Sequence, residues 1–167
     1  MAKITLKGQT CTTNGELPAV GSQAPDFKLT NGKLEDKTLA DFKGKKKLMS
    51  IVPSLDTAVC AASTKKFNEA SKDHGDAVFM IISADLPFAQ THFCDTEKTE
   101  NVTTLSGMRN RNFAKDYGVL IQDGPLAGIM GRAVLVLDEN NKVIYTQLVN
   151  EITNEPDYDK ALSALSA

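Results

Sequence analysis

Cys60 lies where a buried strand gives way to a helix. The apolar run 47–52 is short and ends at Pro53, which is typical of a buried strand. A loop follows, and helical spacing begins at Cys60 and extends to residue 71. Backbone N–H groups and the positive end of the helix dipole favour an anion at such a junction. Because the thiolate is the nucleophilic form of cysteine, this position predicts a reactive thiol.

Thr57 and Pro53, which precede Cys60 in the chain, could take part in its chemistry. The Thr57 hydroxyl can form a hydrogen bond beside the sulfur, or it can cap the helix, a role that Asp56 could also serve. Pro53 ends the strand, and it can also form a rigid wall that shields the thiolate from water. In each case the structural and the chemical roles are compatible.

The cysteine count narrows the chemistry further. The chain has three cysteines, Cys11, Cys60 and Cys94, and an odd, widely spaced set argues against a structural disulfide framework. The roles that remain for these cysteines are buried inert thiols, metal ligands or redox chemistry. His92 beside Cys94 supplies too few ligands for zinc, and Cys11 is expected to be structural or incidental.

Strand and helix patterns alternate along the chain around these residues. Strands are predicted at 77–82, 133–137 and 142–145, and a short strand with a turn at 27–32. Helices are predicted at 87–94, 109–117 and 156–165. Residues 1–20 indicate an appended β-hairpin that turns at Thr13-Asn14-Gly15. His74 is expected in a turn and Arg109 at the start of a helix. Asp56 and Asp85 could orient the loops or cap helices, and the cap is the favoured role. Together these patterns predict an α/β protein with a mixed sheet.

Length and composition limit the class of protein. The 167 residues suit a single domain spanning 1–167, with 41% hydrophobic and 24% charged residues. A net charge of −2 gives no indication of nucleic-acid binding. No stretch approaches the roughly 18 apolar residues of a membrane span, and the N-terminus lacks a signal-peptide pattern. We therefore expect a cytoplasmic protein with no membrane or nucleic-acid partner.

A longer pattern resembles a known family. Pro53-x-x-x-Thr57-x-x-Cys60 is similar to the active-site pattern of peroxiredoxins. Residues 21–27 resemble the family's entry segment, and 83–94 resemble the resolving-cysteine helix of its thiol peroxidase subfamily. Residues 123–126 and 131–134 resemble the last active-site stretch of that subfamily. The likeness runs from the N-terminal hairpin to the final helix.

The resemblance implies a fold and a set of roles. The fold is thioredoxin-like, a central mixed sheet flanked by helices with an N-terminal β-hairpin extension. Cys60 corresponds to the peroxidatic cysteine, with Pro53, Thr57 and Arg132 as its active-site companions. Arg132 would stabilise the thiolate and polarise the peroxide O–O bond. Taken without the resemblance, it is a surface charge at a strand end. Cys94 corresponds to the resolving cysteine.

The same resemblance implies a catalytic cycle. Cys60 would attack hydrogen peroxide or an alkyl or lipid hydroperoxide and become a sulfenic acid, which Cys94 would resolve as an intramolecular disulfide. Because both cysteines are predicted on helices, local unwinding is expected before they meet. No flavin or nicotinamide fingerprint is present and no cofactor is expected, so thioredoxin is the implied reductant. A homodimer is implied as well. A peroxide sensor using the same cysteine pair, or a binding module, are the alternatives.

Overall fold

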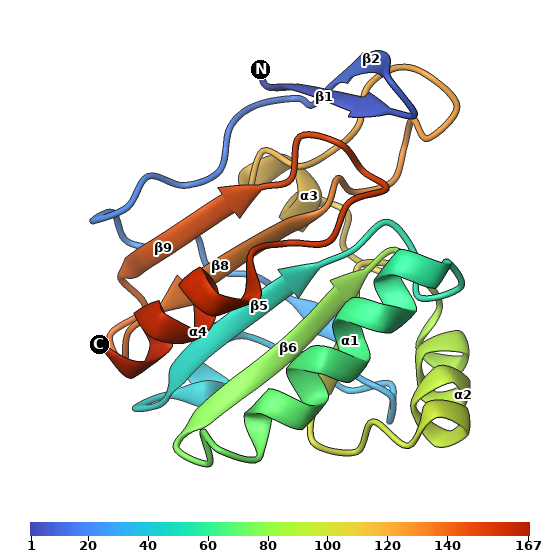
Figure 1. The fold of residues 1–167 in the computed structure, drawn as a ribbon. Coiled ribbons are helices and arrows are strands. Elements are labelled where there is room, and N and C mark those ends of the chain that lie inside the picture. The colour runs from blue at the N-terminus through green and yellow to red at the C-terminus, as the bar shows by residue number, and fades with distance from the viewer.

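Seven strands form one mixed sheet in the order β4-β3-β7-β6-β5-β8-β9 (Figure 1). The computed structural model describes all 167 residues. The strands are β3 (Leu29–Thr30), β4 (Asp36–Lys37), β5 (Lys46–Ile51), β6 (Ala77–Ser83), β7 (Thr103–Ser106), β8 (Ala133–Leu137) and β9 (Val143–Leu148). The apolar runs of β5, β6 and β8 are buried almost throughout, as strands covered on both faces must be. The predicted α/β fold with a central mixed sheet is confirmed.

Helices cover both faces of this sheet. Helices α1 (Ala58–Ser71) and α4 (Tyr158–Ser166) lie on one face, with α2 (Pro87–Glu97) beside α1 near β7 (Figure 1). The other face is covered by α3 (Asn112–Asp116), a 3-10 helix at Leu39–Phe42 and the N-terminal segment. Two apolar clusters result, the larger on the α3 side of the sheet. None of the helices combines the length and the apolar character that crossing a bilayer requires.

The N-terminal hairpin is shorter than predicted and turns elsewhere. Strands β1 (Lys3–Leu6) and β2 (Gln9–Thr12) pair antiparallel across Lys7 and Gly8. Both turn residues have positive φ, 51° and 81°, as the favoured two-residue hairpin turn requires. The predicted turn at Thr13-Asn14-Gly15 is wrong. That segment instead crosses to another part of the chain, where the amide of Asn14 donates to Leu120 O.

Several element boundaries also differ from expectation. Strand β7 and the 3-10 helix were not predicted, because a four-residue run and a single turn carry little periodicity. Helix α1 begins two residues before Cys60, and α2 continues to Glu97. Helix α3 is only five residues long and begins at Asn112, so the predicted residues 109–111 lie outside it.

Candidate active site

Strand pairing brings three separate segments to one edge of the sheet. In the antiparallel pair β5–β8, Ile51 lies opposite Ala133, so Arg132 stands beside the loop that follows β5. In the parallel pair β5–β6, Ile51 lies opposite Ile82, so Asp85 follows at the same edge. Sites in open α/β sheets typically lie at the carboxyl ends of parallel strands. The loop 52–57, Arg132 and Asp85 meet at such an edge.

Arg132 and Cys60 are in direct contact in a buried setting. Nη2 of Arg132 donates a hydrogen bond to Sγ of Cys60 over 3.3 Å, and Cys60 has no exposed surface. Nε of Arg132 donates to the carbonyl oxygen of Ile152 at 3.0 Å, which fixes the plane of the guanidinium. Nη1 is buried and has no partner in the protein. Arg132 is therefore not a surface charge, and the N–H groups of Nη1 are available for an oxygen atom placed beside the sulfur.

The first turn of α1 adds further donors. The first helical hydrogen bond runs from the amide of Ala61 to Thr57 O at 2.9 Å. The amides of Val59 and Cys60 precede that bond and have no acceptor in the protein. These amides and the positive end of the helix dipole lie at the helix start that carries Cys60, where they favour negative charge.

Pro53 and Thr57 lie at opposite ends of the loop before Cys60. Pro53 is buried two residues after the end of β5, at the base of the loop. Thr57 occupies the N-cap position of α1, but its side chain makes no capping hydrogen bond. Its hydroxyl donates instead to Ser54 O at 3.0 Å, and no hydrogen bond joins it to Cys60. In this state the Thr57 hydroxyl closes the loop on itself.

Asp85 orients a loop of the site, which is the less favoured of the two roles expected from the sequence. The favoured role, a helix cap, is wrong, because the N-cap of α2 is Leu86. The Asp85 carboxylate instead accepts hydrogen bonds from Ser54 Oγ at 2.7 Å and from the Leu55 amide at 2.8 Å. The available signal was its position two residues after β6, at the same sheet edge as the loop before Cys60. Asp56, the other expected cap, is exposed.

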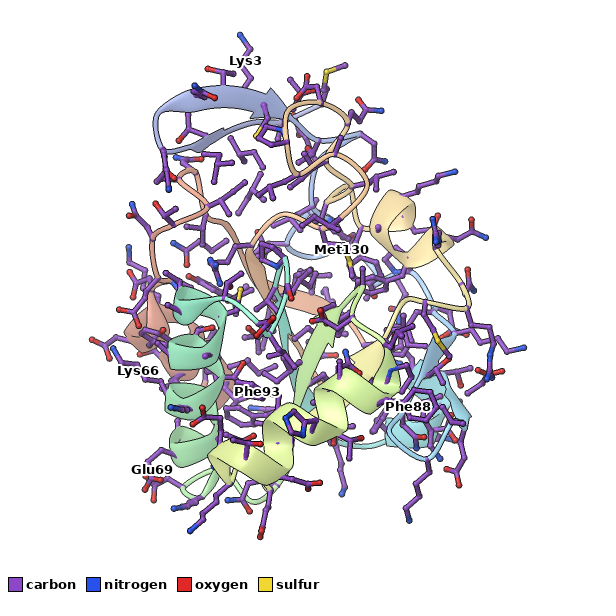
Figure 2. The ribbon with its side chains drawn as sticks, turned by 90° about the vertical axis from the view of Figure 1, so that its right-hand side faces the viewer. Lys3, Lys66, Glu69, Phe88, Phe93 and Met130 are labelled. Atoms are coloured by element: carbon purple, nitrogen blue, oxygen red, sulfur yellow. The ribbon has the colours of Figure 1, made fainter.

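Cys94 lies on α2 and does not bond to Cys60. Both residues are free thiols. Burial raises the pKa of the half-buried Cys94 thiol, so its thiolate is disfavoured where it stands. The neighbouring Phe93 faces α1 (Figure 2) and packs against the apolar cluster that contains Cys60. Consecutive helical residues point about 100° apart. Phe93 therefore occupies the side of α2 that Cys94 would need in order to meet Cys60.

Helix α2 ends in a backbone conformation that is unfavourable for most residue types. Lys98, the C-cap, has φ 53° and ψ 46°, the left-handed region that glycine adopts most readily. The carbonyl of Cys94 accepts hydrogen bonds from the amides of Lys98 and Thr99 in this terminal turn. The last turn of α2, which includes Cys94, is therefore less stable than one ended by glycine.

A cleft separates the loop before Cys60 from α2. Its volume is about 450 Å³. Leu55, Ala89 and Phe93 give it an apolar portion, and polar side chains such as Asp85 and His92 line the remainder. The cleft is therefore amphipathic and reaches the segments that carry both cysteines.

The N-terminal hairpin supports Arg132 through the chain that follows β9. The Ile152 amide donates to Thr5 O at 2.9 Å, so β1 fixes the residue whose carbonyl holds Arg132. The Glu151 carboxylate accepts hydrogen bonds from the Thr5 hydroxyl and from the amides of Lys7 and Gly8. These hydrogen bonds lower the pKa of Glu151 to about 2, and the bond from the Thr5 hydroxyl contributes most. The hairpin is thus part of the framework of the site.

The remaining candidate residues lie apart from Cys60. Cys11 is buried in the hairpin's own apolar cluster, and burial raises the pKa of its thiol. Arg109 pairs with Asp36 at 2.8 Å on the surface, and His74 follows the end of α1. His92 is exposed at the cleft. No group of three or more His, Cys, Asp or Glu side chains is placed to hold a metal ion.

Comparison with known proteins places this site in a family. The Redoxin family model matches residues 19–162. A thiol peroxidase from Corynebacterium glutamicum is 48% identical over 99% of this chain and 100% of its own length. A thiol peroxidase from Mycobacterium bovis is 50% identical over the whole of both chains. The crystal structure of a peroxiredoxin-like protein from Aquifex aeolicus superposes with a TM-score of 0.93 at 40% identity, covering 99% of this chain and 96% of that one. The chain therefore belongs to the Redoxin family and, within it, to the thiol peroxidases, so it is a peroxidase of the oxidoreductase class.

Proposed function

We propose that Cys60 is the peroxidatic cysteine of this thiol peroxidase and that Cys94 resolves it. The observation that carries the proposal is the buried contact between Arg132 Nη2 and Cys60 Sγ at 3.3 Å. A guanidinium bonded to a sulfur at a helix start with two unpaired amides stabilises a thiolate and the charge that develops when it reacts. Neither Cys11 nor Cys94 has a cationic side chain within hydrogen-bonding distance of its sulfur.

In the first step the Cys60 thiolate attacks the terminal oxygen of a hydroperoxide. An S–O bond forms while the O–O bond breaks, which gives a sulfenic acid and releases an alcohol or water after protonation of the leaving oxygen. Nη1 of Arg132 and the amides of Val59 and Cys60 have no acceptor in the protein, and in this proposal they donate to the two peroxide oxygens. Thr57 would act here only after its hydroxyl turns away from Ser54 O. Pro53 forms the buried wall behind the loop.

In the second step the Cys94 sulfur attacks the sulfenic sulfur of Cys60 and water leaves, giving an intramolecular disulfide. Because Phe93 lies between α2 and the Cys60 cluster, this step requires α2 to unwind or rotate. A dithiol of the thioredoxin type then reduces the disulfide and restores both thiols. No resident cofactor is needed.

The substrate class we propose is hydrogen peroxide together with alkyl and lipid hydroperoxides. The cleft of about 450 Å³ beside the loop supports the organic substrates, because Leu55, Ala89 and Phe93 offer apolar contacts to a hydrocarbon chain. A homodimer and a cytoplasmic location complete the proposal. The resemblance to the family implies the homodimer, which light scattering tests, and fractionation of cells tests the location.

The test is hydroperoxide consumption in the presence of thioredoxin and its reductase. We expect Cys60→Ser to abolish consumption, and Cys94→Ser to permit one oxidation of Cys60 without sustained turnover. Cys11→Ala is the matched control and should retain full activity. Peptide mass mapping of the oxidised wild type should find Cys60 linked to Cys94. Activity in Cys60→Ser, or a Cys60–Cys11 linkage, would overturn the proposal. A single stoichiometric oxidation with the full reducing system would indicate a sensor instead.

A further inference from the structure

The loop before Cys60 is held by a carboxylate from another segment. Asp85 accepts hydrogen bonds from the Ser54 hydroxyl and from the Leu55 amide. Pro53 and Cys60 flank this pair in the sequence, so the two bonds fix the middle of the loop that sets the position of the sulfur. Hydrogen bonds to a charged acceptor are the stronger kind. Asp85 is half-buried, which protects the bonds from competition with water.

Asp85 is itself anchored to the sheet. Its carboxylate also accepts a hydrogen bond from the Ser83 hydroxyl at 2.7 Å, and its carbonyl oxygen accepts one from Ser106 Oγ. Ser83 ends β6 and Ser106 ends β7. The loop is therefore fastened to the ends of two strands, and it cannot move away from Arg132 unless the bonds to Asp85 break.

The same network reaches the helix that carries Cys94. Gln90 on α2 is fully buried, and its Nε2 donates to Ser83 Oγ and to Leu105 O, each at 3.0 Å. Oε1 of Gln90 has no partner, so the anchorage of α2 is incomplete. Gln90 lies one helical turn before Cys94. Ser83 and Asp85 thus connect the loop before Cys60 with the helix that carries Cys94.

From these contacts we propose that Asp85 is a positioning residue, whose carboxylate holds the loop in the form that receives peroxide and must release it before Cys94 can reach Cys60. The inference rests on the function proposed above and adds a residue to it. Two reactions then compete for the sulfenic acid. Cys94 converts it to a disulfide with loss of water, which requires the released loop. A second hydroperoxide oxidises it to a sulfinic acid and is reduced to water or an alcohol, which requires the held loop.

A positioning role and a purely electrostatic role predict opposite effects. If Asp85 mainly placed a negative charge near the thiolate, Asp85→Asn would relieve repulsion and speed the attack on peroxide. If Asp85 holds the loop, Asp85→Asn loses the carboxylate that accepts from Ser54, Leu55 and Ser83, and the attack slows. Release of the loop in the variant also favours the disulfide over the sulfinic acid.

The experiment measures both reactions in the full-length protein. Because the chain has no tryptophan, oxidation is followed by rapid acid quench, thiol alkylation and mass spectrometry. In Asp85→Asn we expect the rate constant for oxidation of Cys60 to fall about tenfold. We expect the hydrogen peroxide concentration that converts half of Cys60 to sulfinic acid to rise about threefold or more. Ser54→Ala removes one of the two loop bonds and should shift both quantities in the same directions by less.

The control is Asp138→Ala. Asp138 also accepts two backbone N–H bonds, from Asn140 and Lys142, but in the turn between β8 and β9. The Asp138→Ala substitution should lower thermal stability without changing the ratio of disulfide to sulfinic acid. Wild-type values in folded Asp85→Asn and Ser54→Ala, faster oxidation, or an equal shift in Asp138→Ala would each overturn the inference. If the wild type itself forms no Cys60–Cys94 disulfide, the proposed function fails instead, so the two failures are distinguishable.

Discussion

Arg132 donates a hydrogen bond to the sulfur of Cys60 although 72 positions separate them in the chain. The contact follows from the antiparallel pairing of β5 with β8, in which the residue before Ala133 comes to lie beside the loop after Ile51. The guanidinium is then fixed by the carbonyl of Ile152, which the N-terminal hairpin holds in turn. The proposed peroxidatic site thus depends on parts of the chain from both ends.

Arg132→Lys should reduce kcat/KM for hydroperoxide by about two orders of magnitude, the usual cost of losing a donor aimed at developing charge. A lysine has a single ammonium group in place of the planar guanidinium, so it cannot donate to Ile152 O and to Cys60 Sγ in the present geometry. Initial rates with saturating thioredoxin measure the effect. Arg109→Lys is the matched control, because it retains a charge that can pair with the exposed Asp36. Equal losses in both variants would contradict a specific role for Arg132.

Sequence patterns predicted the central elements because those elements depend on local composition. The apolar runs of β5, β6 and β8 and the helical spacing after Cys60 were identified, since burial on both faces leaves a continuous apolar signal. The hairpin turn was misplaced because Asn14-Gly15 is the stronger turn signal. The actual turn at Lys7-Gly8 depends on Glu151, whose carboxylate accepts both turn amides.

The contacts of the site were less predictable than its residues. The resemblance to the family predicts Arg132 as a site residue, but only the strand register explains why it contacts Cys60. The hydrogen bonds of Asp85 to Ser54 and Leu55 join segments 30 or more positions apart, and no local pattern encodes them. The position of Phe93 between α2 and the Cys60 cluster likewise depends on how α2 docks on the sheet.

Lys98→Gly should slow disulfide formation. Lys98 has φ 53°, which costs an L-residue about 1–2 kcal/mol, whereas glycine adopts it freely. After the greater chain entropy of glycine is subtracted, α2 should gain about 0.5 kcal/mol or more at its C-terminal turn. Since Cys94 lies in that part of the helix, its release becomes rarer and closure about twofold slower or more. Rapid quench after one equivalent of peroxide measures the rate.

Lys7→Gly is the matched control for that variant. Lys7 has φ 51°, nearly the same as Lys98, but lies in the hairpin turn away from α2. Its replacement should raise thermal stability by a similar amount without changing the rate of disulfide formation. Unchanged closure in Lys98→Gly, or the same slowing in both variants, would show that the terminal turn of α2 does not limit the step.

Phe93→Ala should destabilise the protein and accelerate disulfide formation. The half-buried ring packs on the cluster of Val52, Leu55, Cys60 and Ile81, so its removal should lower the free energy of unfolding by about 2 kcal/mol. The same loss frees the face of α2 that Cys94 must present. Denaturant unfolding and single-turnover quench measure the two effects. Phe88→Ala is the control on the same helix, because Phe88 is 66% exposed and points away from α1 (Figure 2). A slower closure in Phe93→Ala would contradict the arrangement.

Glu151→Gln should lower stability in a pH-dependent way. Hydrogen bonds from Thr5, Lys7 and Gly8 lower the pKa of Glu151 from 4.5 to about 2 in the folded state. A lowered folded pKa means that the carboxylate stabilises the fold above pH 4.5, and that this contribution is lost as the pH falls toward 2. The difference in Tm between wild type and variant should therefore be largest near neutral pH and close to zero near pH 2. Thermal scans across this range measure it.

The same substitution tests whether the hairpin supports the site. Loosening Glu151 loosens β1 from the segment whose Ile152 carbonyl orients Arg132, so peroxidase activity at pH 7 should fall several-fold. Glu139→Gln in the exposed turn after β8 is the control and should change neither Tm profile nor activity. If Glu151→Gln lowers Tm but leaves the oxidation rate of Cys60 intact, the hairpin stabilises the fold without positioning Arg132. If the Tm difference persists at pH 2, the carboxylate charge is not what anchors the turn.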